Sequence, residues 1–184
     1  DSMTGGLGND GYLVDNVGDV IVETGGQGSD RVYSAVSYAL TAGASVDILS
    51  TDNPTGTAAI ALRGNELGNT IYGNNGNNVL MGAGGNDGLY GYAGADAFRF
   101  DSILGAGNVD MIGDYVVADD TIQLDDAVFA GLSPRVLAAG AFRIGAAAAD
   151  ADDRIIYNPA TGALLFDADG IGAGSAIQFA TLAT

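Results

Sequence analysis

The chain of 184 residues contains no cysteine, no histidine, no tryptophan and no lysine. Without cysteine or histidine, the mechanisms that pair a nucleophile with a histidine base have no residues to use. Cysteine usage likewise says nothing about the redox compartment, because no disulfide can form. No apolar run approaches the length of a transmembrane helix. The composition therefore argues against a histidine- or cysteine-dependent enzyme.

Positive charge is also scarce. Six arginines stand against 23 acidic residues, for a formal net charge of −17. This balance argues against nucleic acid as a partner and against direct membrane insertion. Self-repulsion and 30 glycines oppose compact folding, yet 47% of the residues are hydrophobic, which is too many for a disordered acidic tail. Bound cations reconcile these facts, because the free energy of metal binding then contributes to folding.

A nine-residue repeat is what the sequence has in abundance. Four consecutive copies, GNELGNTIY, GNNGNNVLM, GAGGNDGLY and GYAGADAFR, fill residues 64–99. Two more copies lie upstream, GGLGNDGYL from Gly5 and GGQGSDRVY from Gly25. Each copy is a glycine-rich turn of six residues followed by a short strand with an apolar centre. Repeats of this kind are typical of a parallel β-helix whose turns bind calcium.

The spacing predicts which turns stack. Two repeats form one coil, so the turn at 64–69 lies under 82–87, and the turn at 73–78 lies under 91–96. Glycines at the first, second and fourth places allow positive φ. Calcium takes six to eight oxygen ligands, more than one turn supplies, whereas two stacked turns offer main-chain carbonyls and the side chains at the sixth place. We expect the central strand residues to point inward: Ile71, Leu80, Leu89 and Phe98.

The N-terminal region, residues 1–63, contains two consensus turns twenty residues apart. They predict that Asp10 and Asp30 face one calcium ion; the alternative is a pair of plain Gly-Asp turns. Between 32 and 62 the repeat disappears, but strand-like stretches remain. We interpret this segment as wider, metal-free coils of the same helix, and a linker is the alternative.

Within the repeat block, residues 64–100, the residue that closes each turn changes from asparagine to aspartate along the chain. Its first two turns end in Asn69 and Asn78, and its last two end in Asp87 and Asp96. Asparagine offers a neutral oxygen where aspartate offers a charge, so these mixed pairs should bind calcium more weakly than Asp10 with Asp30. The first turn, which carries Leu67 at its fourth place, is alternatively an end turn without metal.

The C-terminal region, residues 101–184, departs from the repeat. A degenerate turn at 105–110 makes Asp101, Asp110 and Asp114 ligand candidates for a further site, with a solvated acidic strand edge as the alternative. A short helix is expected within 132–149. Residues 154–167 predict a β-hairpin. DADG, which starts at Asp167, predicts a tight turn into a last strand, with a calcium loop as the alternative.

At these repeats the chain resembles the RTX (repeats-in-toxin, hemolysin-type calcium-binding) proteins that Gram-negative bacteria secrete. Residues 98–184 resemble the capping and secretion region of serralysin-like members, although the small, uncharged residues at 180–184 depart from the usual ending. The resemblance implies a right-handed parallel β-roll, export by type I secretion machinery, and a place outside the cell or on its surface. It implies several calcium ions, held by the carbonyl groups of Gly6, Gly8, Gly26, Gly28, Gly85 and Gly94 and the carboxylates of Asp10, Asp30, Asp87 and Asp96.

We therefore expect an all-β module, a parallel β-helix (calcium β-roll) with a β-rich cap, that folds on calcium binding after secretion. It would serve a larger extracellular protein, whose catalytic domain, if present, lies upstream. Catalysis within the chain is disfavoured, since adjacent acids such as Asp125 and Asp126 point to opposite faces of a strand. The alternative function is a surface-layer, filament or adhesin subunit, a homo-oligomer that assembles through open β-helix ends.

Overall fold

The computed structural model describes residues 1–25 and 28–183, and this part of the chain is almost entirely β-structure. Its regular elements contain no α-helix, and its 3-10 helix, η1, spans Ala139–Ala141. None of the described residues forms a helix long and apolar enough to cross a membrane. The strands are β1 (Ser2–Thr4), β2 (Gly11–Val14), β3 (Val20–Val22), β4 (Arg31–Ser34), β5 (Tyr38–Ala39), β6 (Ile48–Thr51), β7 (Ala61–Arg63), β8 (Thr70–Tyr72), β9 (Val79–Met81), β10 (Gly88–Tyr90), β11 (Ala97–Phe100), β12 (Asp110–Ile112), β13 (Thr121–Leu124), β14 (Phe142–Ile144), β15 (Ile155–Asn158), β16 (Ala163–Phe166) and β17 (Ile177–Leu182).

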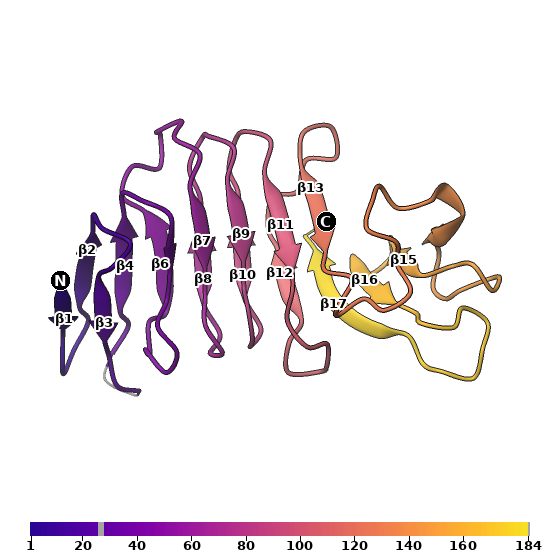
Figure 1. Ribbon diagram of the computed structural model, residues 1–184, viewed down its shortest axis with the longest axis horizontal. Helices are drawn as coiled ribbons and strands as arrows, with labels where there is room; N and C mark the ends of the chain where they lie inside the picture. The colour runs from indigo at the N-terminus through magenta and orange to yellow at the C-terminus, as the bar shows by residue number, and fades with distance from the viewer. Residues whose placement is uncertain (26–27, 184) are drawn as a thin grey trace.

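Successive strands alternate between two parallel sheets. From β4 to β13, the even-numbered strands join a ten-stranded sheet and the odd-numbered strands join a five-stranded sheet. Strands β1 and β3 form a separate parallel pair at the N-terminal end. Figure 1 shows these strands as a row that runs from the N-terminus toward the C-terminal region. The sequence expectation of an all-β protein is therefore confirmed.

The predicted stacking of the repeat block is confirmed in its register. Leu89 pairs with Ile71, and Phe98 pairs with Leu80, each eighteen residues apart. The side chains of these four residues are completely buried. One inward residue per strand is enough to fill the space between the two sheets, because the apolar core between them is thin.

The segment between the two groups of repeats continues the same sheets. Strand β6 pairs with β4 on one side and β8 on the other, and β7 pairs with β5 and β9. Buried Leu49 and Leu62 extend the core through this segment. It therefore belongs to the same two sheets as the repeats and is not a linker between them.

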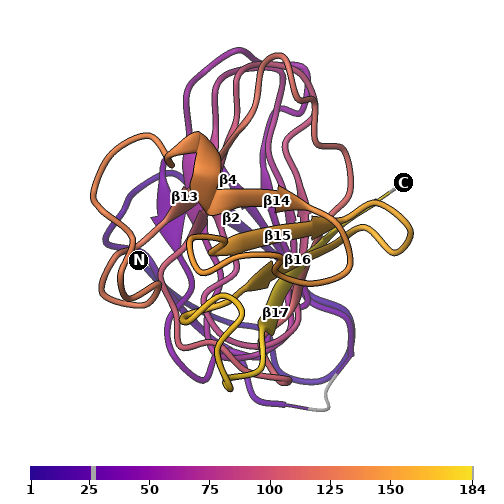
Figure 2. The same ribbon diagram turned by 90° about the vertical axis from the view of Figure 1, so that its right-hand side faces the viewer.

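The C-terminal region closes one end of the ten-stranded sheet. Strand β17 adds parallel to β12, and β16 then pairs antiparallel with β17 and with β15. The predicted hairpin is confirmed, with Ile155 opposite Phe166. The helix expected within 132–149 amounts to η1 alone among the elements of that stretch. In Figure 2 strands β14–β17 lie across the end of the stack.

Candidate metal centre

In five of the turns the first glycine lies against the side chain that closes the turn, whereas Gly25 does not contact Asp30. A Cβ atom on Gly5, Gly82 or Gly91 would collide with the carboxylate of the closing aspartate, and one on Gly64 or Gly73 with the closing asparagine. The φ angles of these five glycines are not positive. The expectation that the first place needs positive φ was therefore wrong: glycine stands there to leave room for the closing side chain.

The second and fourth places do use positive φ in the aspartate-closed turns. Gly6 and Gly8 have φ of 102° and 107°, and Gly85 and Gly94 have 95° and 122°. The fourth place is also crowded, since a Cβ on Gly28 would collide with the main chain of Gly8. Stacked turns thus approach each other at a distance that only glycine permits.

Closing carboxylates link each turn to its neighbour. In each link, the backbone N–H of one closing residue donates to the carboxylate of the next turn along the stack. The N–H of Asp10 donates to Asp30 Oδ1 at 2.8 Å. The same contact joins Asp30 to Asp47, Asn69 to Asp87, Asp87 to Asp110, Asn78 to Asp96, and Asp96 to Asp120.

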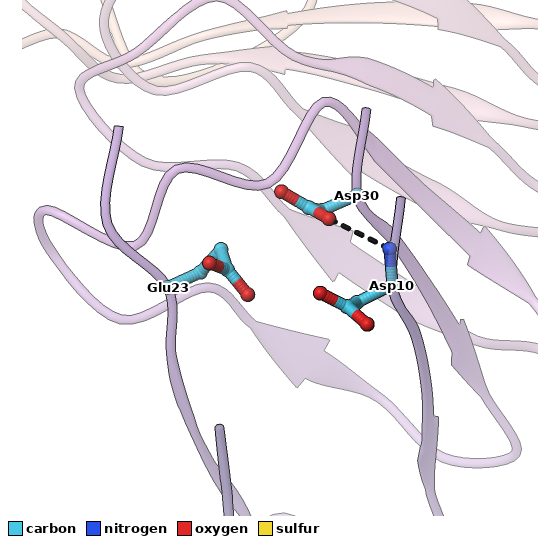
Figure 3. A group of neighbouring side chains, drawn as sticks. All are labelled: Asp10, Glu23 and Asp30. Atoms are coloured by element: carbon cyan, nitrogen blue, oxygen red, sulfur yellow. Dashed lines mark hydrogen bonds between the residues drawn. The ribbon is translucent and has the colours of Figure 1, made fainter. Parts of the chain in front are cut away.

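Three carboxylates converge at the first pair of turns. Oxygen atoms of Asp10, Glu23 and Asp30 all lie within 4.8 Å of one another, and Figure 3 shows the three side chains around one space. Glu23 and Asp30 are buried. The Tyr12 hydroxyl donates to Glu23, and burial followed by this hydrogen bond raises the pKa of the tyrosine above its usual value. This is an anionic, oxygen-only donor set, of the kind that hard divalent cations prefer.

Each aspartate-closed pair leaves a carboxylate oxygen without a partner. Among the described residues, the buried side-chain oxygens that make no hydrogen bond are Asp10 Oδ2, Asp87 Oδ2 and Asp96 Oδ2. Leaving a buried anionic oxygen unpaired costs several kcal/mol, so natural proteins pair such groups or bind metal with them. All three oxygens belong to predicted ligands.

The pKa values of three carboxylates in the second group of turns are raised by burial. Burial raises the pKa of Asp87 to about 6 and that of Asp96 to about 6. Burial and then the charge of Asp87 raise the pKa of Asp110 to about 8. The ionised carboxylates are therefore held in an unfavourable environment that a cation would reverse.

The asparagine-closed turns are satisfied without a cation. Asn69 Oδ1 accepts from the N–H of Asn65, and Asn69 Nδ2 donates to the Val46 carbonyl at 2.7 Å. Asn78 makes the equivalent contacts with both the N–H and the Oδ1 of Asn74. Neither turn contains a positive φ angle. The amide oxygen and the amide nitrogen of both predicted ligands therefore each have a protein partner.

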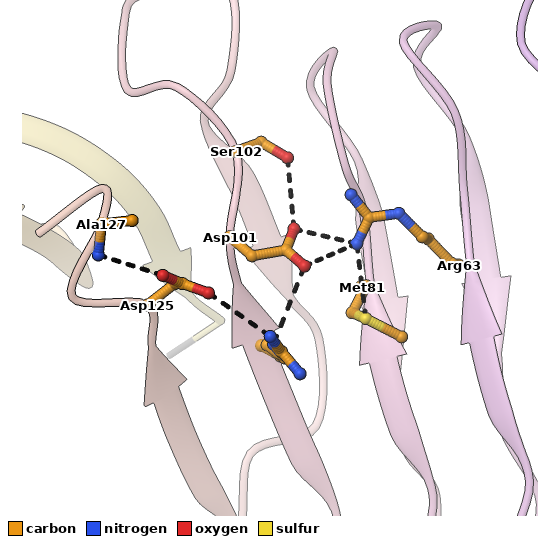
Figure 4. Close-up of polar contacts among 7 residues, drawn as sticks. Arg63, Met81, Asp101, Ser102, Asp125 and Ala127 are labelled. Carbon is orange, nitrogen blue, oxygen red and sulfur yellow. Dashed lines mark hydrogen bonds and ion pairs between the residues drawn. The ribbon is translucent and has the colours of Figure 1, made fainter. Parts of the chain in front are cut away.

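The further site expected from Asp101, Asp110 and Asp114 does not come together. Asp101 forms an ion pair with Arg63 at 2.7 Å, as Figure 4 shows. Asp110 accepts from the N–H of Asp87, and Asp114 accepts from the N–H groups of residues 91 and 92. Asp110 and Asp114 thus each bind the main chain of a different turn, whereas Asp101 pairs with arginine side chains.

Three partners of the predicted ligands, Glu23, Asp47 and Asp120, were missed by the sequence reasoning. Glu23 precedes the turn at 25–30 and carries no repeat signature. Asp120 closes a turn without the glycine pattern, but it stands directly before β13, just as Asp10 stands before β2. An aspartate immediately before a strand is the signal that would have found it. Gly26, a predicted carbonyl ligand, lies outside the described residues.

No protein-family model matches this sequence, and no curated protein matches it. The features that favour a metal centre are the repeat, the stacked turns and the unpaired oxygens.

Proposed function

We propose that the chain is a calcium-binding module of the RTX type, with the strands wound as a right-handed parallel β-roll. The observation that supports this most directly is the set of unpaired buried oxygens on Asp10, Asp87 and Asp96. Each lies in a turn whose glycines let main-chain carbonyls of two coils approach one another. Carboxylate and carbonyl oxygens together form the coordination shell that calcium requires.

Calcium fits these turns better than other biological cations. Zinc and copper prefer nitrogen and sulfur ligands, and the chain has neither histidine nor cysteine. Magnesium demands a near-octahedral shell and gives up its waters reluctantly, whereas calcium accepts the irregular arrangement that two stacked turns provide. We expect three to about six ions, the first of them between Asp10, Glu23 and Asp30.

Calcium dependence gives the module a task in secretion. In a cytosol with little free calcium, a chain of net charge −17 with unpaired buried carboxylates disfavours the folded state. Outside the cell, the roughly 10⁻⁴–10⁻³ M affinities of extracellular modules are sufficient to fill the sites. Folding outside would oppose return through a type I channel, and the folded module would then serve the extracellular protein to which it belongs.

A calcium titration tests the proposal. The chain is stripped with EDTA and followed by circular dichroism while calcium, or magnesium as a control, is added. We expect a cooperative gain of β-signal with calcium alone. A triple variant, D10N/D87N/D96N, should require much more calcium, whereas the exposed control Asp52→Asn should behave as the wild type. A stripped chain that is already fully folded, and unchanged by calcium, would refute the proposal.

Self-assembly into a filament or surface layer is the second candidate. It needs two open ends, and strands β1 and β2 leave the N-terminal edges of their sheets available for pairing. At the opposite end, β14–β17 extend the ten-stranded sheet and turn across it. This cap favours a monomeric module over a continuous stack. Sedimentation velocity in calcium separates the two, since assembly predicts large species and the module predicts a compact monomer.

A further inference from the structure

The two groups of aspartate-closed turns are separated by a centre of different chemistry. We define this centre as residues 38–81, which include strands β5–β9. Its acidic residues are Asp47, Asp52 and Glu66, all exposed, and they stand against one arginine. Residues 82–126, by contrast, carry nine acidic residues and one arginine. The centre therefore buries no carboxylate and carries little net charge.

Asparagine amides join the coils of this centre. Asn65 Nδ2 donates to the Ala44 carbonyl at 2.7 Å, Asn69 Nδ2 to the Val46 carbonyl at 2.7 Å, and Asn74 Nδ2 to a main-chain carbonyl of the loop before β7 at 3.1 Å. These donors and acceptors lie 16 to 23 residues apart in the chain. Each amide thus bridges two successive coils, which is the role proposed for calcium in the other turns.

The centre also contributes to the apolar core. Its hydrophobic residues belong to one cluster that continues into the strands on both sides. The buried members from the centre are Tyr38, Leu40, Ala44, Val46, Leu49, Ile60, Leu62, Ile71 and Leu80. Because burial of apolar surface does not depend on metal, this core stabilises the centre in the presence or absence of calcium.

We propose that residues 38–81 form a calcium-independent centre from which metal-dependent order spreads in both directions. In the stripped protein the asparagine-bridged coils stay folded, while the flanking coils, with their unpaired carboxylates, open. Calcium then adds the flanking coils onto strands that are already in register. The inference relies on the proposed function, since it assigns a calcium-free state to one part of a calcium-dependent module.

Hydrogen exchange measured by mass spectrometry on the whole chain tests this inference. In EDTA we expect amides of β7–β9 to exchange at least about tenfold more slowly than those of β10 and β11. In calcium the difference should disappear. Equal and fast exchange of both regions in EDTA would overturn the proposed centre and leave the calcium module intact. Slow exchange of both regions in EDTA, unchanged by calcium, would overturn the calcium module itself.

A matched pair of variants sharpens the test. Asn78→Asp replaces a buried amide that donates to Asn74 Oδ1 with a carboxylate facing the same oxygen. Protection of residues 73–81 should then be lost in EDTA and recovered in calcium. Asn75→Asp introduces the same charge at an exposed place in the same turn and should leave protection unchanged. Asn78 holds Asn74, whose amide bridges to the loop before β7, so if N78D retains its protection in EDTA, the hydrogen bonds of this turn do not make the centre independent of calcium.

Discussion

Asn69 and Asp87 occupy the same place in turns one coil apart, and each is 3% exposed. Their side chains have nearly the same shape. The amide of Asn69 donates to Val46 and accepts from Asn65, whereas Asp87 accepts from the N–H of Asn69 and keeps one oxygen unpaired. One group, an NH₂ or an oxygen, thus distinguishes a turn closed by hydrogen bonds from a turn that leaves a buried carboxylate oxygen unpaired.

The largest change in stability is expected when the asparagine that closes the first of these turns is replaced. Asn69→Ala leaves the N–H of Asn65 and the carbonyl of Val46 buried without their partner. Since each unsatisfied group costs about 1–3 kcal/mol, we expect the free energy of unfolding to fall by about 3 kcal/mol. Urea unfolding should give the same loss in EDTA and in calcium. A loss confined to calcium would mean that Asn69 is a metal ligand.

The matching change at Asp87 should depend on calcium. In calcium, Asp87→Ala removes one site, which at free calcium about 100-fold above the dissociation constant costs about 2.7 kcal/mol. In EDTA the same change removes a buried, unpaired charge and should not destabilise the protein further. Urea unfolding in both conditions checks this difference, with the exposed Asp52→Ala as control. An equal loss in both conditions would contradict a metal role for Asp87.

The pH dependence of stability should reverse with calcium. Burial raises the pKa of Asp87 to about 6 and that of Asp110 to about 8, so between about pH 4 and pH 8 the metal-free folded state binds more protons than the unfolded state. Stability in EDTA should therefore fall as pH rises through this window, by at least about 1.4 kcal/mol. In calcium, which requires deprotonated ligands, stability should rise instead.

Thermal unfolding at several pH values measures both slopes. Asp110→Asn keeps the shape of the side chain but cannot ionise, so its slope in EDTA should be flatter than that of the wild type. A slope that D110N leaves unchanged would show that other groups control the pH dependence.

The smallest effect concerns backbone strain in an aspartate-closed turn. Ala83 has φ of 75° at the second place, where the first consensus turn has Gly6. Ala83→Gly removes the strain of a left-handed alanine, and we expect stabilisation of about 0.5–1 kcal/mol in calcium, measured by urea unfolding. Leu67 lies in an asparagine-closed turn without positive φ, so Leu67→Gly should instead lower the free energy of unfolding. Destabilisation by A83G would indicate that the turn does not need this conformation.

Much of the site could be predicted because the repeat is local. The six-residue turn and three-residue strand recur without a change of register, so the sequence locates Asp10, Asp30, Asp87 and Asp96 as closing residues. Glu23, Asp47 and Asp120 escaped because they reach the same edges from coils of irregular length. Asp47 and Asp120 lie 17 and 24 residues from the closing residues that they contact, and no fixed period connects such pairs.

The sequence by itself determined the all-β class, the eighteen-residue stacking and the inward residues, because a strict period of nine leaves one way to place turn and strand. Only the tertiary structure decided which closing side chains are satisfied. The amide of Asn78 donates to Asn74 Oδ1, whereas Asp96 Oδ2 has no hydrogen-bond partner. A side chain is satisfied only where the fold places a donor or an acceptor within about 3 Å of it. The repeat itself does not specify that distance.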